Sequence, residues 1–383
     1  MFGARTPGRR VHRFNKRSVV AAAAVSLGVL ASAAVPARAD GGNALNTAHA
    51  SPGNFQLNYT SLQSQLTAAA NRPGTSSVDF WTTVKAGAGT TTSCGTGCRE
   101  WQDSANNDTL WYPQGLAGTL ESNWNSPPPQ QVIASGWYKR PTADDGSSST
   151  DTAIKFLFTT TPTGTTWNYR HIPLRTADAA GATSPLTAHM GGLAWAGSAI
   201  YMASTDRIYR FDVRDMLRDA DGAFLLPNAV YVDRASAPGG KARLSSLSTD
   251  WSTSPPALVS AEYSAEDDTA RTTVVRWPLT SGAGLVVTNN IVNSESDYNI
   301  TPSSDINRVQ GVASKNGLYY FSGSLNRLDS ARADSQVDRK SRTTWGVSGG
   351  IPQDLYLESG TSRLFGQTEK RTLRRVFWDS SPL

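Results

Sequence analysis

One short phrase recurs along the chain and constrains its fold more than any other feature. The copies read YPQGL at 112–116, HMGGL at 189–193, RLSSL at 243–247, NRVQGV at 307–312 and IPQDL at 351–355. Their last residues are spaced 77, 54, 65 and 43 residues apart. Short apolar or alternating runs, bounded by Gly, Ser or Asp, follow each copy and indicate β-strands. The chain therefore contains a repeated unit of antiparallel strands.

A single unit of this kind cannot bury both faces of its sheet. Units stacked around an axis cover one another and leave only short edges, which is the arrangement of a β-propeller. We therefore predict an all-β fold, a single β-propeller over 112–383 with five blades. Six blades is the alternative, because the first interval has room for one more. Residues 40–111 are predicted to form a short N-terminal helical and loop extension, with a helix within 55–70 and a strand at 78–84.

The first 39 residues have the three-part pattern of a secretory signal peptide. Six basic residues and no acid precede an apolar run at 18–35, and Ala37-Arg38-Ala39 offers a small-residue cleavage site. The alternative is a transmembrane anchor, but the run is rich in Ala and barely long enough. The Arg9-Arg10 pair leaves the twin-arginine export route open. We expect a secreted, extracellular protein that has no membrane attachment after cleavage.

Removal of the signal peptide changes the charge of the chain. The full sequence has 36 Lys and Arg against 31 Asp and Glu, but seven of the basic residues lie in 1–39. The mature chain is then close to neutral, at −2. Such a balance gives no support for a nucleic-acid partner. We expect a monomer whose partner is a polar extracellular ligand or a protein.

The two cysteines, Cys94 and Cys98, lie four residues apart. In an exported protein two nearby thiols usually pair, so we predict a local disulfide. Metal binding is the alternative, but two cysteines without a nearby His make a poor site.

The motifs of the repeats resemble known proteins. PQGL, GGLAW, VQGV and the closing RLFGQTE…RRVF resemble a group of uncharacterised secreted actinobacterial β-propeller proteins. More distantly, GGLAWAGSAIYMAST is similar to six-bladed gluconolactonase/NHL-type propellers. The first resemblance implies the fold and no activity. The second implies one metal at the axis, held by Glu, Asn and Asp, a set that we cannot place here residue by residue.

Two further motifs have simpler explanations. Gly346-Val347-Ser348-Gly349-Gly350 matches the G-x-S-x-G of α/β-hydrolases, but no His follows it and its context is not strand–turn–helix. We interpret it as a turn. Residues 218–222 (RDADG) resemble a calcium loop, but Leu217 and Asn228 fall at the positions where its first ligand and its bidentate Glu belong. A polar hairpin or a turn at a helix end is expected there.

The candidate site comes from the circular symmetry of a propeller. Equivalent positions in each blade point towards one axis, so polar residues of the repeated openings should meet at one mouth of the channel. Glycines beside them leave room for a ligand. The predicted ligand-binding residues are Gln114, His189, Gln310, Asp354 and Glu369. The alternative is that these side chains only satisfy backbone groups in a narrow channel.

Three functions follow from these residues. Amides are good hydrogen-bonding groups but poor acids or bases, so we first expect binding of a polar ligand, a carbohydrate or a peptide. The second hypothesis is a hydrolase or lactonase that uses a divalent cation at the axis with Asp354 or Glu369. The third is a platform for protein interactions. The sequence does not identify a cofactor, and it does not decide whether the protein is an enzyme.

Overall fold

The computed structural model describes most of the chain beyond the predicted signal peptide. The described residues are 45–48, 55–121, 131–142, 149–159, 166–234, 244–263, 273–300, 306, 308–323, 327–332, 338–340, 352–358, 361 and 363–380. The signal peptide at 1–39 and the G-x-S-x-G motif at 346–350 lie outside them. Residues 40–383 form one compact unit. Within the described part, no helix is long and apolar enough to cross a membrane.

Close to half of the described residues belong to five antiparallel sheets, each with four principal strands, and further strands pair at their edges. The first contains β6 (Trp111–Gly118), β7 (Gln131–Lys139), β8 (Asp151–Thr159) and β9 (Trp167–Ala177); the second β11 (Gly192–Ala196), β12 (Ala199–Ser204), β13 (Arg207–Asp212) and β15 (Phe224–Arg234); the third β16 (Ser248–Asp250), β17 (Ala257–Ala261), β18 (Thr273–Pro278) and β20 (Ser296–Ile300); the fourth β21 (Val309–Lys315), β22 (Leu318–Gly323), β23 (Arg327–Arg332) and β24 (Asp338–Lys340); and the fifth β25 (Pro352–Leu357), β26 (Leu364–Thr368), β27 (Arg375–Asp379) and β5 (Cys98–Trp101).

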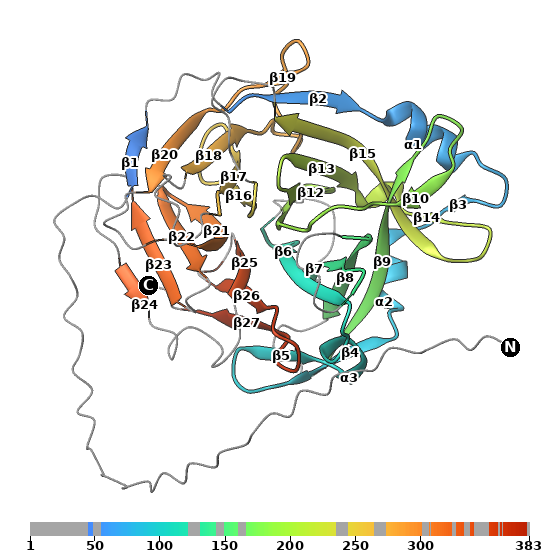
Figure 1. Ribbon diagram of the computed structural model, residues 1–383, viewed down its shortest axis with the longest axis horizontal. Coiled ribbons are helices and arrows are strands. Elements are labelled where there is room, and N and C mark those ends of the chain that lie inside the picture. The colour runs from blue at the N-terminus through green and yellow to red at the C-terminus, as the bar shows by residue number, and fades with distance from the viewer. Residues whose placement is uncertain are drawn as a thin grey trace, which may run out of the picture. The chain divides into compact units, whose positions relative to one another are not determined.

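The inner strands of the sheets form a closed circle. β6 contacts β11, β11 contacts β16, β16 contacts β21, β21 contacts β25, and β25 contacts β6 again. Figure 1 looks along the axis of this circle. Each of the five recurring phrases leads into or begins one inner strand, as the repeat predicts. The all-β propeller fold is therefore confirmed. The total number of blades stays a prediction, although five sheets are present among the described residues.

Strands that precede β6 in the sequence pair with strands of the sheets. β1 (Leu45–Ala48) pairs with β20, β2 (Leu57–Ser61) with β15, and β4 (Gly89–Ser93) with both β5 and β9. β5 is the outer strand of the fifth sheet, so the β4–β5 hairpin joins that sheet to the first one. Residues 45–48 and 55–101 thus form a belt around the rim of four sheets, which we call the N-terminal belt.

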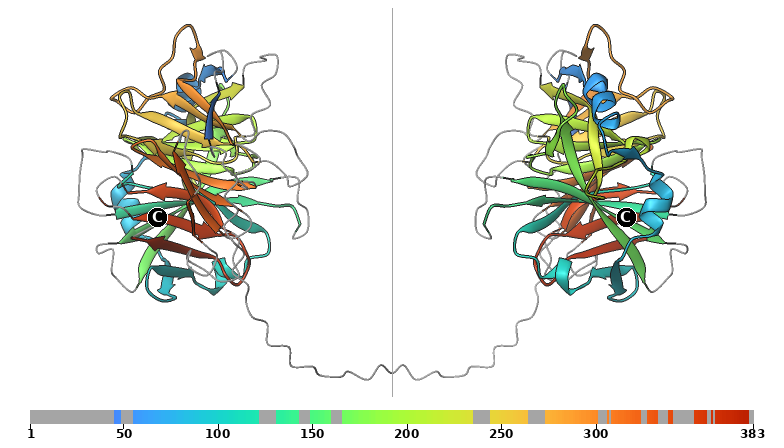
Figure 2. Two further views of the ribbon diagram at one scale, coloured as in Figure 1. Left: turned by 90° about the vertical axis from the view of Figure 1, so that its left-hand side faces the viewer. Right: turned by 90° about the vertical axis from the view of Figure 1, so that its right-hand side faces the viewer.

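Short helices complete the belt. α1 (Gln63–Ala70) and α2 (Phe80–Lys85) lie on the outside of the sheets (Figure 2), and α3 (Asp103–Asn106) follows β5. The strand expected at 78–84 is wrong, because Asp79 caps a helix there by accepting a hydrogen bond from the Thr82 amide at 2.7 Å. The helix expected within 55–70 occupies only its second half. The remaining short elements are β3 (Ser76–Ser77), β10 (Thr183–Pro185), the 3-10 helix η1 (Val213–Asp215), β14 (Leu217–Arg218) and β19 (Ile291–Val292).

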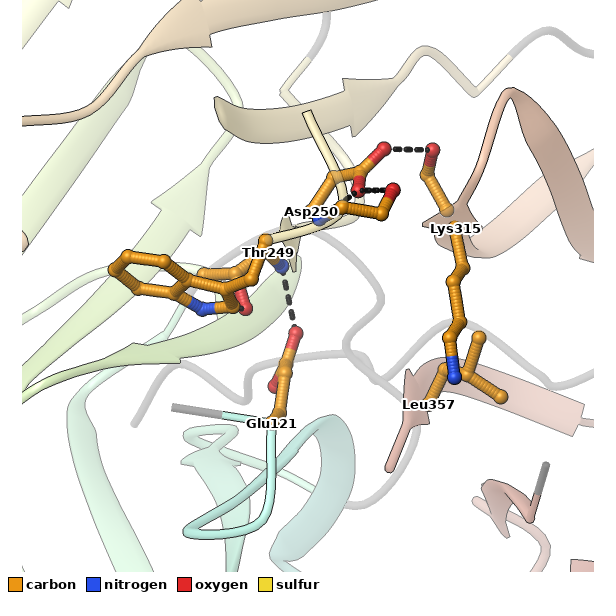
Figure 3. A pocket seen from close by; sticks show the side chains of 8 residues that line it. Glu121, Thr249, Asp250, Lys315 and Leu357 are labelled. Atoms are coloured by element: carbon orange, nitrogen blue, oxygen red, sulfur yellow. Dashed lines mark hydrogen bonds between the residues drawn. The ribbon is translucent and has the colours of Figure 1, made fainter. Parts of the chain in front are cut away.

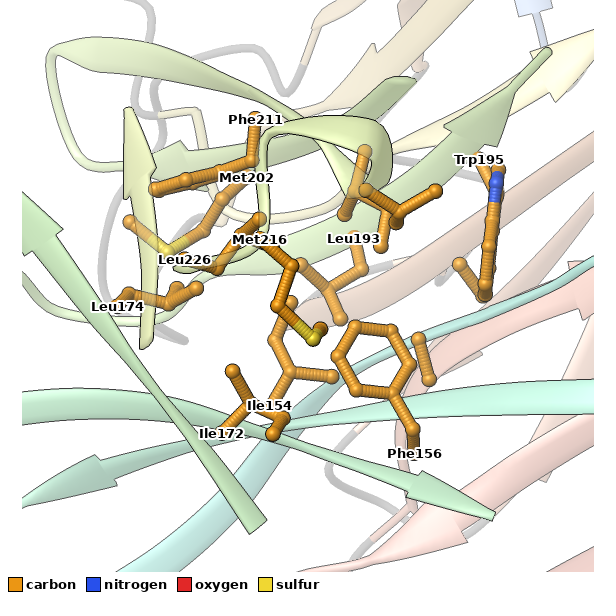
Figure 4. Packing of buried hydrophobic residues seen from close by; sticks show 14 of the residues in the cluster. Ile154, Phe156, Ile172, Leu174, Leu193, Trp195, Met202, Phe211, Met216 and Leu226 are labelled. Atoms are coloured by element: carbon orange, nitrogen blue, oxygen red, sulfur yellow. The ribbon is translucent and has the colours of Figure 1, made fainter. Parts of the chain in front are cut away.

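The core lies between neighbouring sheets. Ile154 and Phe156 of the first sheet pack with Leu193, Trp195 and other apolar side chains of the second (Figure 4). All four of these side chains are fully buried. Along a strand, alternate residues face opposite sides, and a neighbouring sheet covers each side. Both faces of a single strand are therefore apolar.

The two cysteines close the turn of the β4–β5 hairpin. Cys94 and Cys98 are bonded, with their Cα atoms 5.2 Å apart. Because the bond closes a loop of only a few residues, replacing both cysteines by Ser should lower the free energy of unfolding by about 2 kcal/mol. Urea denaturation of the double variant and of the reduced wild type should give the same loss. A loss above about 4 kcal/mol would show that the bond does more than restrict the unfolded chain.

Candidate functional site

Three of the repeated openings contain the same irregularity. The strand register shifts between Pro113 and Leu116, between Val309 and Gly311, and between Pro352 and Leu355. Each shift falls at the Gln of the PQGL, VQGV or PQDL phrase. The shared letters therefore specify a β-bulge at the start of an inner strand, and bulges redirect the side chains that they contain.

Asp354 occupies the place that glycine or serine takes in the other four openings. Its side chain is fully buried, and its Oδ2 atom accepts hydrogen bonds from the amides of Leu116 at 3.0 Å and Leu193 at 2.7 Å. One carboxyl group thus ties the inner strand of the fifth sheet to those of the first and second. Burial raises the pKa of Asp354 well above its usual value.

The glycines of the openings are explained by close approach. A Cβ atom on Gly311 would lie 2.7 Å from the Asp354 Cα atom, and one on Gly115 would lie 2.7 Å from the Leu193 side chain. Neither position has room for a larger residue. The small residues around Asp354 therefore allow the inner strands to meet at the axis.

Two of the predicted residues meet at Tyr138, at the end of the inner strands where the openings lie. We call this the opening end. The Tyr138 hydroxyl donates to Glu369 Oε1 at 3.2 Å and accepts from Arg140 at 2.5 Å. The Gln353 amide donates to Glu369 Oε2 at 3.0 Å, and the His189 ring lies 4.6 Å from the Tyr138 ring. Tyr138, Arg140 and Gln353 were not among the predicted residues.

Burial sets the ionisation of this group. It raises the pKa of Glu369, although the Arg140 guanidinium opposes the effect. It lowers the pKa of His189 to about 4, with a further contribution from Arg140. His189 is therefore neutral at physiological pH and is able to act as both donor and acceptor.

Within the described part of the chain, Gln114 and Gln310 form no hydrogen bond with this group. Gln114 is buried, and its Oε1 atom has no partner within the part of the chain that the structure describes. Gln310 is partly buried on β21. The two cavities found among the described residues include none of the five predicted residues. Ligand binding by this set therefore stays a prediction.

A cavity of about 130 Å³ lies at the other end of the inner strands, which we call the far end (Figure 3). Glu121 follows β6, Asp250 ends β16, Lys315 ends β21 and Leu357 ends β25. The cavity is lined by Glu121, Thr249, Asp250, Trp251, Ser252, Ser314, Lys315 and Leu357. Three sheets and the turn after β6 thus contribute to one polar cavity.

One wall of this far-end cavity is a saturated hydrogen-bond network. Asp250 Oδ2 accepts from Arg276 at 2.9 Å and from the Ser314 hydroxyl at 2.7 Å. Its Oδ1 atom accepts from the amide and hydroxyl of Ser252. Because every acceptor position of Asp250 is occupied, this wall is rigid and offers a ligand little free hydrogen-bonding capacity.

The Glu121 carboxyl is not part of the hydrogen-bond network around Asp250. Its side chain is 2% exposed, and its Oε1 atom accepts from the Thr249 amide at 2.6 Å. Its Oε2 atom has no hydrogen-bond partner among the described residues and is itself fully buried, so it does not face the open part of the cavity. Burial raises the pKa of Glu121 to about 8, against the lowering effect of hydrogen bonds from Thr249 and from the backbone of Trp195 and Gly118. At neutral pH most of this carboxyl is therefore protonated.

A second cavity, of about 340 Å³, lies at the rim beside α1 and β14. Its charged residues Arg72 and Asp221 are exposed. Asp219, which also lines it, accepts a hydrogen bond from the Ala223 amide at 2.8 Å. The RDADG segment is thus the polar hairpin that its sequence predicts.

No group of three or more His, Cys, Asp or Glu that could hold a metal ion occurs within the described ranges. Asp354 and Glu121 are two of the buried carboxyl groups near the axis, and each has one oxygen without a partner among the described residues. A cation at the axis stays an untested possibility.

Comparison with known proteins identifies no function for the chain. No family model and no curated protein match the chain. Among solved structures, the chain is similar to the β-propeller domain of Myceliophteria thermophila Cps50 (Swd1), with 11% identity, a TM-score of 0.31 and coverage of 70% of this chain and 83% of that one. Chaetomium thermophilum Raptor gives 11% identity and a TM-score of 0.30; 71% of this chain is covered, but only 29% of the Raptor chain.

Proposed function

We propose that this β-propeller is secreted and binds a small polar extracellular ligand at the far end of its axis. The observation that supports the proposal is the far-end cavity of about 130 Å³, which is built from the ends of three inner strands and the turn after β6. Its lining combines apolar surface from Trp251 and Leu357 with polar groups of Thr249, Ser252 and Lys315. A mainly apolar lining with a few polar groups is typical of a small-molecule site.

Secretion rests on separate observations. The first 39 residues have the signal-peptide pattern, and the Cys94–Cys98 bond is typical of an oxidising compartment. The direct test of secretion is N-terminal sequencing of the protein recovered from the culture medium, which should begin at Asp40.

The propeller axis is also a common place for a ligand, since side chains from several blades converge there.

The lactonase hypothesis has less support from the contacts. Glu369 is held by Tyr138, Arg140 and Gln353, and Asp354 by two backbone amides. Either carboxyl would have to give up these bonds to bind a metal ion or a substrate. The lining of the far-end cavity includes neither of these two carboxyl groups.

The ionisation of Glu121 gives a test of its burial. A carboxyl whose pKa is raised by folding stabilises the protein fully below its unfolded pKa, and this contribution is lost as the pH rises through about 8. Replacement by Gln removes the ionisation. Between pH 5 and pH 9, Glu121→Gln should therefore gain about 3–5 kcal/mol in unfolding free energy relative to the wild type.

Urea denaturation of both proteins across this range would measure the change. The matched control is Asp221→Asn, because Asp221 is exposed at the rim and its replacement should show no comparable dependence on pH. Parallel curves for Glu121→Gln and the wild type would mean that Glu121 is accessible to water.

A further inference from the structure

The second cavity, of about 340 Å³, is formed by three segments outside the ring of inner strands. They are residues 69–75, from the end of α1 to the loop before β3; residues 181–183, at the start of β10; and residues 217–225, in the hairpin of β14 and β15. We call it the rim cavity. Figure 1 shows α1, β3, β10 and β14 gathered at one side of the molecule. The volume lies within the range of roughly 300–1,000 Å³ that is usual for small-molecule sites.

Close contacts hold the three segments around the rim cavity. A Cβ atom on Gly181 would lie 2.4 Å from the carbonyl carbon of Ala68, and one on Gly74 would lie 2.8 Å from the Ala220 Cβ atom. Both glycines also have positive φ angles, of 78° and 81° respectively. β3, which follows the loop of residues 71–75, pairs with β14. The walls of the rim cavity are therefore fixed by the fold.

Opposite charges line the rim cavity without neutralising one another. Arg72 is exposed, and it forms no ion pair within the described part of the chain. Asp221 is also exposed, and Asp219 is partly exposed. Asp219 Oδ1 accepts from the Ala223 amide at 2.8 Å, whereas its Oδ2 atom accepts no hydrogen bond from a described residue. One guanidinium and two carboxylates of the lining thus keep hydrogen-bonding capacity for a ligand.

The buried part of the lining is apolar. Ala69, Leu217 and Leu225 line the rim cavity, and all three belong to one buried apolar cluster. An aliphatic group of a few carbon atoms that covers this surface would remove apolar area from water. The ligand that fits the rim cavity therefore has an apolar part as well as two charges of opposite sign.

We propose that the rim cavity binds a free α-amino acid with a small aliphatic side chain. The Arg72 guanidinium binds its carboxylate, because the N–H groups of a guanidinium match the two oxygens of a carboxylate. Asp219 and Asp221 accept hydrogen bonds from its ammonium group. Its side chain lies on Leu217 and Leu225. A ligand with a single charge would leave the opposite charge of the lining without a partner.

A divalent metal ion fits the same residues less well. Ca²⁺ takes about 6–8 oxygen ligands, whereas Asp219 and Asp221 are the only carboxylates among the lining residues that the structure describes. Arg72 lines the same space, and its positive charge opposes a metal ion there.

The rim cavity shares no residue with the far-end cavity, so the two sites can be tested separately. For the far-end cavity, a screen of small extracellular solutes should find one whose binding is lost in Trp251→Ala and retained in Arg72→Gln. The absence of any such solute would mean that the proposed function is wrong, whatever the rim cavity binds.

The test of the rim cavity is isothermal titration calorimetry on the mature chain, residues 40–383, at pH 7. The probes are L-valine, isobutylamine, which is valine without its carboxylate, and 3-methylbutanoate, which is valine without its ammonium group. We expect L-valine to bind. Each analogue should bind about tenfold more weakly or less, because it leaves one charge of the lining without its partner.

Single substitutions assign the two ends of the ligand. Arg72→Gln should weaken L-valine binding about tenfold without weakening that of isobutylamine, and Asp221→Asn should weaken it about tenfold without weakening that of 3-methylbutanoate. The matched controls are Lys85→Gln and Asp206→Asn, because both residues are exposed, lie outside the lining and undergo the same changes of charge. Their affinity for L-valine should equal that of the wild type. Thermal unfolding verifies that all four variants are folded.

Four results would overturn the inference. The first is that none of the three probes binds. The second is that one analogue binds as tightly as L-valine, because recognition would then need a single charge. The third is that L-valine binds equally to the wild type, Arg72→Gln and Asp221→Asn, because its site would then lie elsewhere. The fourth is binding of CaCl₂ that is lost in Asp221→Asn, without any binding of L-valine, which would assign the cavity to a cation.

Discussion

Replacing Asp354 by Ala is expected to lower the free energy of unfolding by about 3–6 kcal/mol. The change removes the acceptor of two buried amides, and each unpaired amide costs about 1–3 kcal/mol. It also leaves a cavity at a position where three sheets meet. Urea denaturation at pH 5 would measure the loss. A variant within about 1 kcal/mol of the wild type would show that the Asp354 bonds do not hold the sheets together.

The matched control is Asp354→Asn. It keeps an oxygen that can accept one or both of the Leu116 and Leu193 amides, so its loss should be smaller than that of the Ala variant. Burial raises the pKa of Asp354, so the wild-type carboxyl contributes its full stability below the unfolded pKa and loses it as the pH rises. The Asn variant has no such group. Its stability relative to the wild type should therefore improve as the pH is raised from 4.

The sequence predicted the inner strands of the propeller because their signal is repeated. Each opening phrase marks a strand that must approach the axis, and close approach demands small residues such as Gly115 and Gly311. The same phrase specifies the bulge at Gln114, Gln310 and Gln353. Both the repetition of the phrase and its requirement for small residues can be recognised from the amino-acid sequence. The propeller fold was accordingly predictable from five short phrases.

The candidate site was less predictable, because its residues share no motif. Glu121, Asp250 and Lys315 lie at or just beyond the ends of different inner strands, at the end away from the openings. Their nearness depends on where each strand ends, which the opening phrases do not fix. At the opening end, His189 and Glu369 both contact Tyr138, which comes from β7 and lies outside the repeated opening phrases.

The pairing of the N-terminal belt with the sheets was not predicted, for a related reason. Its strands are short, polar in part and separated by turns and helices, so no periodic pattern marks them. What they add is edge pairing: β2 and β5 provide hydrogen bonds to strands far away in the sequence. Such pairing depends on the tertiary arrangement, and local sequence preferences do not reveal it.

The contribution of the belt can be measured at Trp101, in β5. This side chain is 1% exposed and packs edge-on against Trp137 at 5.2 Å and Tyr169 at 5.0 Å, both from the first sheet. Because it fills the seam between the first and fifth sheets, Trp101→Ala should lower the free energy of unfolding by about 3–5 kcal/mol.

The control for this variant is Thr92→Ala, in the neighbouring strand β4. Thr92 is exposed, so its replacement should change the stability by less than about 0.5 kcal/mol. Chemical denaturation of the two variants would then show whether the buried Trp101 side chain, rather than any substitution in the belt, stabilises the propeller. Equal and small losses of unfolding free energy in the two variants would mean that the packing of β5 contributes little to stability. The large difference that we expect would show that β5 contributes core packing between the first and fifth sheets.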